Sequence, residues 1–179
     1  GRKYSKYYEV RRANQIVNLF RKYQYIIDIH QTRANKKIII IIPKITKNVL
    51  LFASCFLIKD ILIWPSISKK KTVPPVQYAP YGIEIECGVK TSLQKTLKKL
   101  TKILIHFLRQ KTIFIKDIKF SAKHLKEKNF YLVYEQIKLG DTRGKKLYDF
   151  REFDNGSEKF IPLLFGKHQG LLGYKMQEV

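Results

Sequence analysis

Residues 150–165 read FREFDNGSEKFIPLLF, and they predict a β-hairpin. Asn155 and Gly156 separate two runs in which large apolar side chains recur. Asn-Gly is the dipeptide that tight hairpin turns favour most, because both residues accept a positive φ. Pro162, in the second run, lacks a backbone donor and therefore favours an edge strand or a bulge.

Runs of β-branched and aromatic residues predict further strands upstream of this hairpin. Three of them are TIFIKDIKF (112–120), NFYLVYEQI (129–137) and KLYDFREF (146–153). Two more, YIIDIH (25–30) and KIIIIIP (37–43), are separated by a polar connector and are predicted to pair with each other. Pro43 is expected to end the second of these strands.

Two segments have helical spacing. Residues 12–24 carry an apolar stripe. In residues 91–109, Leu and Phe side chains fall on one side of a helix and Lys and Arg side chains fall on the other. An ordinary surface helix mixes charges to form i,i+4 pairs, so this helix is predicted to face an anion. The apolar residues 49–64 fit an interior helix or an interior strand.

These elements predict an α+β fold with a small sheet of mostly antiparallel strands, packed helices and basic extensions. Residues 1–65 are expected to form an N-terminal helix and strand region or an extension. Residues 66–82 are rich in Pro and Lys and are expected to be a linker or an arm. Residues 83–179 are then expected to form an α+β region that includes the hairpin.

The charge is the strongest compositional signal. Lys and Arg number 36 against 14 Asp and Glu, which gives a net charge of +22 and a pI near 10.0. A folded body with so much like charge repels itself and needs a polyanion as partner. Nucleic acid is the first candidate and an anionic membrane face is the second. The apolar run 49–58 is much shorter than the about 20 residues that span a bilayer, so membrane contact is not expected.

Three stretches offer cations to a phosphate backbone. Tyr4, Tyr7 and Tyr8 stand among basic residues, a pattern that suits stacking on unpaired bases. The alternative is an arm that packs on its own protein. The loop 138–146, KLGDTRGKK, either approaches phosphates closely or simply connects two strands. The three lysines at 69–71 either follow a phosphate backbone or form a solvated run.

Motifs that carry catalysis are absent from the sequence, including GxxxxGK[ST], GxGxxG, HExxH and GxSxG. Glu84 and Glu86 alternate with Ile and share a strand face, where they could do acid–base work. A solvated strand face or a salt bridge to the excess lysines is the preferred interpretation. An enzyme, a metal site and a cofactor are therefore not predicted. The histidines without metal-ligand spacing are His30, His106, His124 and His168.

Two cysteines, Cys55 and Cys87, stand far apart in the sequence and have no CxxC or His spacing beside them. A disulfide between them has no support. They are expected to be free thiols in a reducing compartment.

The elements NG..KFIPL and LLGYKMQE resemble the C-terminal part of small-subunit ribosomal protein nineteen, where a YNGKKFIPV hairpin leads into MVGHKLGEF. The usual RSxWKGPF opening of that family is missing. The resemblance implies a small α+β protein that contacts small-subunit rRNA and lies beside small-subunit ribosomal protein thirteen. The matching residues are Asn155, Gly156, Lys159, Phe160, Ile161, Pro162, Gly173, Lys175 and Glu178.

The sequence therefore predicts a structural constituent of the mitochondrial small ribosomal subunit, in the mitochondrial matrix, a location favoured by the Ile, Lys and Asn bias of an AT-rich genome. Its expected partners are rRNA and neighbouring ribosomal proteins, and a free homo-oligomer is not expected. The alternative is a basic accessory subunit of an organellar inner-membrane complex. The predicted RNA-binding residues are Arg2, Lys3, Arg11, Arg12, Lys69, Lys70, Lys71, Lys95, Lys98, Lys99, Lys102, Arg109, Arg143, Lys145, Lys146, Lys159 and Lys175.

Overall fold

The structure is a computed structural model that describes residues 7–31, 37–65, 74–88, 93–116, 123–166 and 172–179. Within residues 93–116 the side chains of residue 93 and of 110–116 are not described. The helices are α1 (Tyr8–Phe20), α2 (Lys47–Ser54) and α3 (Leu93–Lys116), with short 3₁₀ turns η1 (Pro75–Tyr78) and η2 (Leu139–Thr142). The strands are β1 (Tyr25–Gln31), β2 (Ile38–Ile42), β3 (Asp60–Ile63), β4 (Tyr81–Cys87), β5 (Asn129–Gln136), β6 (Phe153–Asp154), β7 (Lys159–Leu163) and β8 (Tyr174–Glu178).

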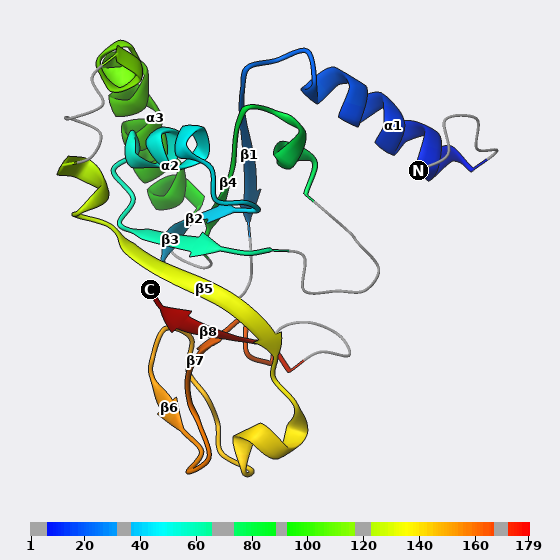
Figure 1. Cartoon of the computed structure of the whole chain (residues 1–179), viewed down its shortest axis with the longest axis vertical. Helices are drawn as coiled ribbons and strands as arrows, with labels where there is room; N and C mark the ends of the chain where they lie inside the picture. Colours follow the sequence, from blue (N-terminus) through cyan, green and yellow to red (C-terminus); the bar gives the residue numbers. More distant parts are fainter. Residues whose placement is uncertain (1–6, 32–36, 66–73, 89–92, 117–122, 167–171) are drawn as a thin grey trace.

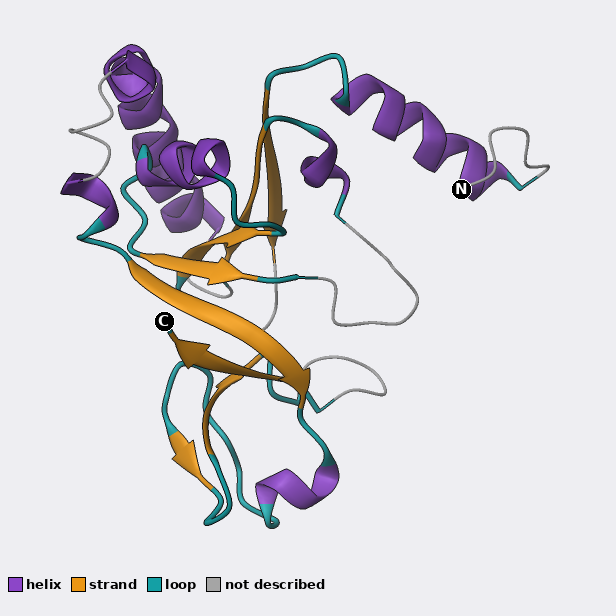
Figure 2. Cartoon of the chain, viewed as in Figure 1, coloured by secondary structure: helices purple, strands orange, loops and turns teal. Residues whose placement is uncertain are grey.

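The strands form one eight-stranded sheet in the order β1-β4-β2-β3-β5-β8-β7-β6. Three pairs are parallel, β1 with β4, β2 with β3 and β3 with β5, and the other pairs are antiparallel. The α+β class is confirmed. The predicted small, mostly antiparallel sheet is wrong in its details, because the sheet is large and mixed (Figure 2).

Strand β4 lies between β1 and β2, so the predicted pairing of 25–30 with 37–43 is wrong. The polar connector between those two runs had suggested a hairpin. Instead β1 runs parallel to β4, and β4 pairs antiparallel with β2 on its other side. Segments on both sides of the expected linker 66–82 therefore belong to the same sheet.

Helices α2 and α3 cover one face of the sheet (Figure 1). Thr46 caps α2 by accepting a hydrogen bond from the Val49 amide at 3.2 Å. The ring of Phe52 meets that of Phe107 edge-on with centroids 5.4 Å apart, which ties α2 to α3, and Phe56, just after α2, stacks on Phe107 at 4.7 Å. The segment 49–64 therefore contains both an interior helix, α2, and an interior strand, β3.

Helix α3 confirms the predicted helix at 91–109 and extends it to Lys116. The predicted apolar stripe is confirmed in part, since Phe107 is buried and Leu100 and Leu104 pack against the core. The buried side is nevertheless rotated, because Thr96 and Ile103 are also buried while Leu97 and Leu108 are 50% and 61% exposed. The predicted strand 112–120 is wrong over 112–116, which continue the helix, and 117–120 lie outside the described residues. Strand propensity at β-branched residues is overridden here by continuation of the helix.

The other face of the sheet carries a second core, which joins the C-terminal strands to the middle of the sheet and includes Ile39, Leu62, Leu163 and Met176. The predicted hairpin is confirmed: β6 and β7 pair antiparallel, and Gly156 takes a φ of +83° in the turn. The predicted strand 146–153 is wrong except at its last residue. The segment before it is held as a loop, in which Asp149 Oδ1 accepts a hydrogen bond from the Phe165 amide at 2.9 Å.

Both cysteines are free and buried, as their spacing indicated. Among the described helices, none is both long enough and apolar enough to cross a membrane.

Candidate metal centre on strands β1 and β4

Four ionisable side chains lie side by side on β1 and β4. In the parallel register, Asp28 is opposite Glu84 and His30 is opposite Glu86. Alternate residues of a strand point to the same face, so all four belong to one face of the sheet. This is the face opposite α2 and α3, because the intervening Ile83 and Ile85 pack into the helix-covered core.

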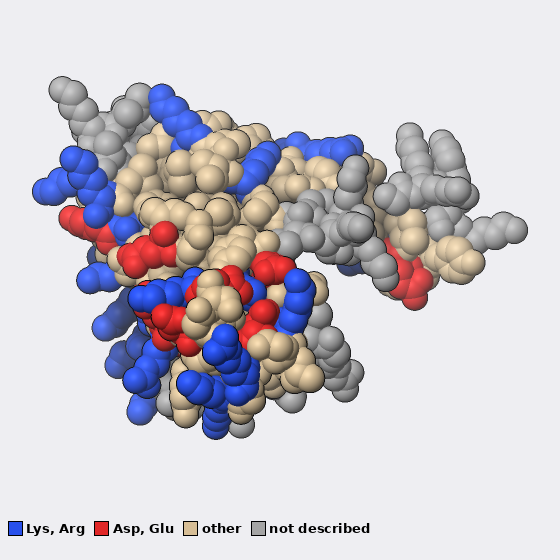
Figure 3. Space-filling view, turned by 60° about the horizontal axis from the view of Figure 1, so that its bottom comes forward, with Lys and Arg blue, Asp and Glu red and all other residues tan. Residues whose placement is uncertain are grey.

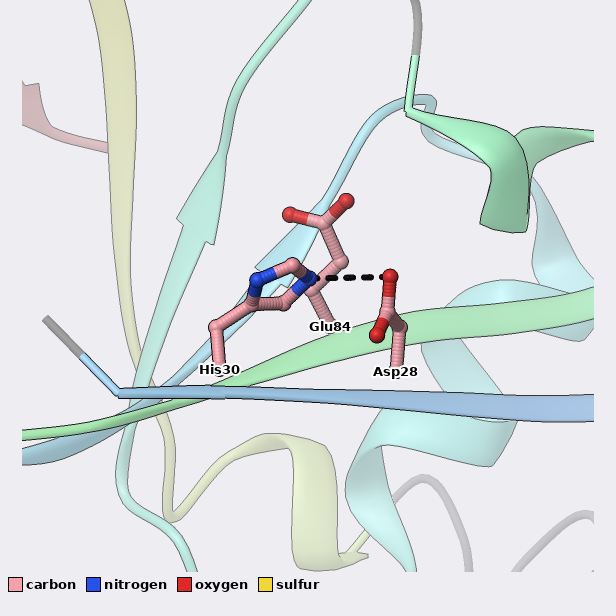
Figure 4. Close-up of side chains that lie close together, drawn as sticks. All are labelled: Asp28, His30 and Glu84. Carbon is pink, nitrogen blue, oxygen red and sulfur yellow. Dashed lines mark ion pairs between the residues drawn. The ribbon is translucent and has the colours of Figure 1, made fainter. Parts of the chain in front are cut away.

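The side chains of Asp28, His30 and Glu84 converge (Figure 4). His30 Nε2 lies 2.8 Å from Asp28 Oδ2, and one potential ligand atom from each of the three residues lies within 4.8 Å of the others. Asp28 and Glu84 are half-buried, while the His30 side chain is 49% exposed. We call these three residues the Asp28–His30–Glu84 cluster.

The electrostatics of the cluster favour a cation. Burial raises the pKa of Glu84 to about 7, and the charges of Asp28 and Glu86 raise it against the lowering effect of His30. Burial lowers the pKa of His30, but the hydrogen bond to Asp28 and the negative charges of Asp28, Glu84 and Glu86 outweigh it and raise the pKa. A chain with net charge +22 therefore has an acidic site at this point of its sheet.

The donor set fits a divalent first-row metal ion. Zinc in proteins binds imidazole nitrogen and carboxylate oxygen at about 2.0–2.2 Å, so its ligand atoms lie about 3.4 Å from one another in a tetrahedron. The separations in the cluster, from 2.8 Å up to 4.8 Å, bracket that value. Small side-chain rotations would bring the three atoms to a metal.

The backbone around the cluster is fixed by the start of β4. Gly82 packs against η1 so closely that a Cβ on it would lie 1.8 Å from the Val76 carbonyl oxygen. Val76 and Ala79 are buried and pack against Ile26 of β1. η1 thus holds the beginnings of β1 and β4 together, and the register of the cluster follows from it.

The sequence interpretation missed this site. The preferred interpretation of Glu84 and Glu86 is a solvated strand face or a salt bridge to lysines, and the missing ligand spacing around His30 favours a structural or RNA-facing histidine. The available signal was the i,i+2 spacing in "DIH" and "EIE", which puts each pair on one strand face. What brings the two pairs together is the β1–β4 pairing, which spans more than 50 residues of sequence.

The predicted RNA-binding residues that the structure describes lie on several separate elements. Those of α1, α3, the η2–β6 loop and β7 are exposed, and Figure 3 shows Lys and Arg side chains spread over the face in view, with carboxylates among them. The residues Arg2, Lys3, Lys69, Lys70 and Lys71 lie outside the described part of the chain. The exposed ones are Arg11, Arg12, Lys95, Lys98, Lys99, Lys102, Arg109, Arg143, Lys145, Lys146 and Lys159.

Lys175 differs from these lysines because it is buried, with 2% of its surface exposed. Its Nζ lies 3.2 Å from Glu135 Oε2 and 3.0 Å from Asp141 Oδ2, and it also donates a hydrogen bond to Glu158. The side chain therefore joins β8, β5, η2 and the β6–β7 hairpin from inside the protein.

Solved structures share this arrangement of helices and strands. Neither a family model nor a curated protein sequence matches the chain. Murine aminoacylase 3 superposes with a TM-score of 0.68 at 14% identity, covering 100% of this chain and 73% of that one. The chain shares its fold with aminoacylase 3.

A glutamate-to-alanine mutant of the same murine enzyme matches with a TM-score of 0.67 at 13% identity. Succinylglutamate desuccinylase from Vibrio parahaemolyticus matches with a TM-score of 0.61 at 16% identity, over 99% of this chain and 63% of that one. At these identities the likeness shows the fold alone.

These matches overturn the ribosomal interpretation. The resemblance to small-subunit ribosomal protein nineteen is wrong, and so are the predicted role in the ribosome, the predicted rRNA and ribosomal-protein partners and the prediction that the chain is not an enzyme, because the solved chains with its fold are enzymes. The resemblance rested in part on Asn155 and Gly156, which hairpin turns favour in unrelated folds. The net charge of +22 was the basis for predicting a nucleic-acid partner, but net charge does not identify a fold.

Proposed function

We propose that the chain carries the core of the active site of a metal-dependent hydrolase that cleaves the amide bond of an N-acyl amino acid. The observation that carries this proposal is the Asp28–His30–Glu84 cluster on two parallel strands. Asp28 and Glu84 are the central residues of β1 and β4, and His30 lies toward the carboxyl end of β1. Open α/β sheets bind ligands beyond the carboxyl ends of their strands. The names of the solved neighbours, an aminoacylase and a desuccinylase, supply the class of bond.

In this proposal His30 provides a nitrogen donor and the carboxylates of Asp28 and Glu84 provide oxygen donors for a divalent ion. When bound there, the ion would act as a Lewis acid on the carbonyl of the scissile amide. Asp28 has a second role, because its contact with His30 Nε2 holds the imidazole ring in place. The ring then keeps one orientation before a ligand arrives.

Glu86 is the candidate for proton transfer. It is the register partner of His30, follows Glu84 by two residues on the same strand face, and has a buried Oε2 atom. A carboxylate in this position can accept a proton from the attacking water and return it to the leaving amine nitrogen. Amide hydrolysis needs both transfers, since an amine leaves only after it is protonated.

The test begins with metal binding, which does not depend on a substrate. The metal-free chain is titrated with Zn²⁺ by calorimetry, and the loaded chain is then assayed on N-acetyl and N-succinyl amino acids. We expect one Zn²⁺ per chain, and we expect Glu86→Gln to lower kcat by about 10²–10⁴-fold while it leaves the zinc affinity unchanged. The matched control is Glu152→Gln, a carboxylate paired only loosely with Lys159, at 3.9 Å.

Two results would count against the proposal. One is a chain that does not bind one Zn²⁺ per molecule. The same holds if the His30→Ala variant binds Zn²⁺ as tightly as the unsubstituted chain does. The other is equal hydrolysis rates for the Zn²⁺-loaded Glu86→Gln and Glu152→Gln variants.

The mitochondrial matrix remains the proposed location, on the composition of the sequence alone.

A further inference from the structure

Helix α3 has an exposed apolar strip in addition to its buried side. Leu97, Ile105 and Leu108 are 50%, 43% and 61% exposed. At about 100° per residue, these three side chains fall within about 80° of the helix circumference. The strip is separate from the buried side, to which Ile103 and Phe107 belong. α3 therefore presents apolar surface to the core on one side and to solvent on another.

A strip of cations runs directly beside the exposed apolar strip. On the same helix projection, four exposed basic side chains occupy the next sector, which is about 60° wide. None of the 24 residues of α3 is Asp or Glu. The ion pairs that the described residues form do not involve these cations. We call the two strips together the α3 face. Its basic side chains are Lys95, Lys98, Lys102 and Arg109.

The arrangement of these charges favours an anionic partner. Lys98 and Lys102 are four residues apart, and so are Lys95 and Lys99. Like charges at this spacing repel one another and destabilise a helix. An anion bound along the α3 face would offset that repulsion. Figure 1 shows α3 at the end of the molecule opposite the β6–β7 hairpin, so the acidic residues of the hairpin do not neutralise it.

The composition of the α3 face favours a lipid surface as that anion. Protein–protein interfaces are depleted in Lys and enriched in Arg and aromatic residues. Single-stranded nucleic acids stack their bases on aromatic side chains. The α3 face has three lysines, one arginine and no aromatic side chain. Basic side chains beside a row of Leu and Ile are typical of helices that lie in a membrane interface, where lysine stems cover apolar surface and the charges stay among the headgroups.

We propose that the α3 face binds the surface of a membrane that contains anionic phospholipids. The cations contact the lipid phosphates, while Leu97, Ile105 and Leu108 enter the layer just below the headgroups. α3 lies along the surface, because lysines spaced through the helix exclude a spanning orientation. The expectation of no membrane contact rested on the short apolar run 49–58, which concerns spanning and not surface binding.

Sedimentation with vesicles tests the proposal on the whole 179-residue chain. Vesicles of phosphatidylcholine alone are compared with vesicles in which about 30% of the lipid is phosphatidylglycerol, at about 0.1 M NaCl. We expect at least about 10-fold tighter binding to the anionic vesicles. Most of that binding should be lost at about 1 M NaCl, where charges are screened beyond about 3 Å. Equal binding to both kinds of vesicle would overturn the proposal.

Two double variants separate the α3 face from the net charge of the chain. Lys98→Gln/Lys102→Gln removes two charges from the face, and Lys145→Gln/Lys146→Gln removes two from the exposed loop between η2 and β6. We expect the first to weaken binding to anionic vesicles by about 25-fold, since each lysine near such a surface contributes about fivefold. The second should weaken it less than about threefold. Equal losses would show that net charge alone attracts the chain, which contradicts the proposal.

A pair of leucine variants tests whether apolar side chains enter the lipid. Leu108→Gln changes the apolar strip, and Leu139→Gln changes a leucine of η2 that is 78% exposed. We expect Leu108→Gln to weaken vesicle binding by about 10-fold, because the leucine is no longer buried in lipid, and Leu139→Gln to leave it unchanged. Glutamine is a good helix former, so circular dichroism should show the same helix content in both variants. Unchanged binding by Leu108→Gln would overturn the proposal.

Polyglutamate and polyuridylate serve as probes for the other polyanions. If either one binds in a way that requires Lys98 and Lys102, while the anionic vesicles are not bound, the α3 face belongs to an acidic protein or to a nucleic acid and the proposal is wrong. The Asp28–His30–Glu84 cluster lies on the opposite face of the sheet, and none of these measurements uses a metal or a substrate. Failure here and failure of the proposed function are therefore distinguishable.

Discussion

His30 Nε2 and Asp28 Oδ2 lie 2.8 Å apart on β1, opposite Glu86 and Glu84 of β4 respectively. The pair is two residues apart in sequence and acquires its carboxylate neighbours only through the parallel register. A single histidine with three nearby carboxylates is the arrangement on which the proposed hydrolase depends.

Asp28→Asn is expected to weaken zinc binding by about 10–100-fold, because the amide keeps the size of the carboxylate but removes its charge and its hold on the imidazole. The measurement is competition with a chromogenic chelator. Asp154→Asn, a carboxylate on β6, is the control and should leave the affinity unchanged. Equal affinities in the two variants would remove Asp28 from the site.

Gly82→Ala is expected to destabilise the protein by about 1–3 kcal/mol or more, since the added Cβ would lie 1.8 Å from the Val76 carbonyl and the backbone must move. Gly140→Ala is the matched control, because a Cβ there meets nothing within 4 Å. Urea unfolding followed by circular dichroism measures both. A Gly82→Ala variant as stable as Gly140→Ala would mean that η1 does not fix the start of β4.

Lys175→Met is expected to destabilise the protein by about 1–3 kcal/mol at pH 7, because it leaves the carboxylates of Glu135, Asp141 and Glu158 close together without their cation, although water reaches them in part. Lys159→Met removes an exposed lysine from β7 and should cost less than about 1 kcal/mol. If the two variants unfold at the same urea concentration, the buried ion cluster does not stabilise the C-terminal strands.

The same cluster predicts acid sensitivity. Hydrogen bonds from Lys138 and Lys175 lower the pKa of Glu135. Burial raises the pKa of Asp141, but its hydrogen bonds to the Lys138 amide and to Lys175 outweigh burial and lower the pKa. A carboxyl group with a lowered folded pKa adds stability above its unfolded pKa, here 4.5 and 3.8, and that stability is lost as the pH falls through the folded value.

The contribution of Glu135 and Asp141 to the urea midpoint should therefore stay level from pH 7 down to about pH 5 and then fall. Protonation of Glu84, whose folded pKa is raised to about 7, adds a separate gain in stability as the pH falls from 7, so the cluster is followed as the difference between the parent and Lys175→Met. In Lys175→Met the carboxylates repel one another, so protonating them should narrow the gap between variant and parent as the pH falls. A gap that stays constant with pH would show that these carboxylates do not titrate with the cluster.

The thiols are expected to be unreactive in the folded protein. Burial raises the pKa of Cys55 to about 12, and burial also raises the pKa of Cys87. At pH 8 the thiolate fraction of Cys55 is on the order of 1 in 10⁴, and only the thiolate attacks a disulfide reagent. We expect no rapid labelling by an aromatic disulfide reagent in buffer and labelling of both cysteines in guanidinium. Rapid labelling in buffer would mean that α2 opens locally.

Local sequence determined the elements whose signals lie within a few residues. The hairpin followed from Asn155 and Gly156, the helix at 91–109 from its apolar spacing, and the strands at 25–30 and 129–137 from β-branched and aromatic runs. Each of these elements depends on the backbone preference of its own residues and on the spacing of apolar side chains along one side. Both can be read from a short stretch of sequence.

Pairing between distant segments was decided by the tertiary structure alone. The insertion of β4 between β1 and β2, the rotation of α3 and the burial of Lys175 depend on which surfaces meet, and composition does not encode that. The candidate site has the same origin. Asp28 and His30 on one strand, and Glu84 and Glu86 on another, have the pattern of ordinary strand faces. The parallel register is what places Asp28, His30 and Glu84 within reach of one cation, with Glu86 next along the same face.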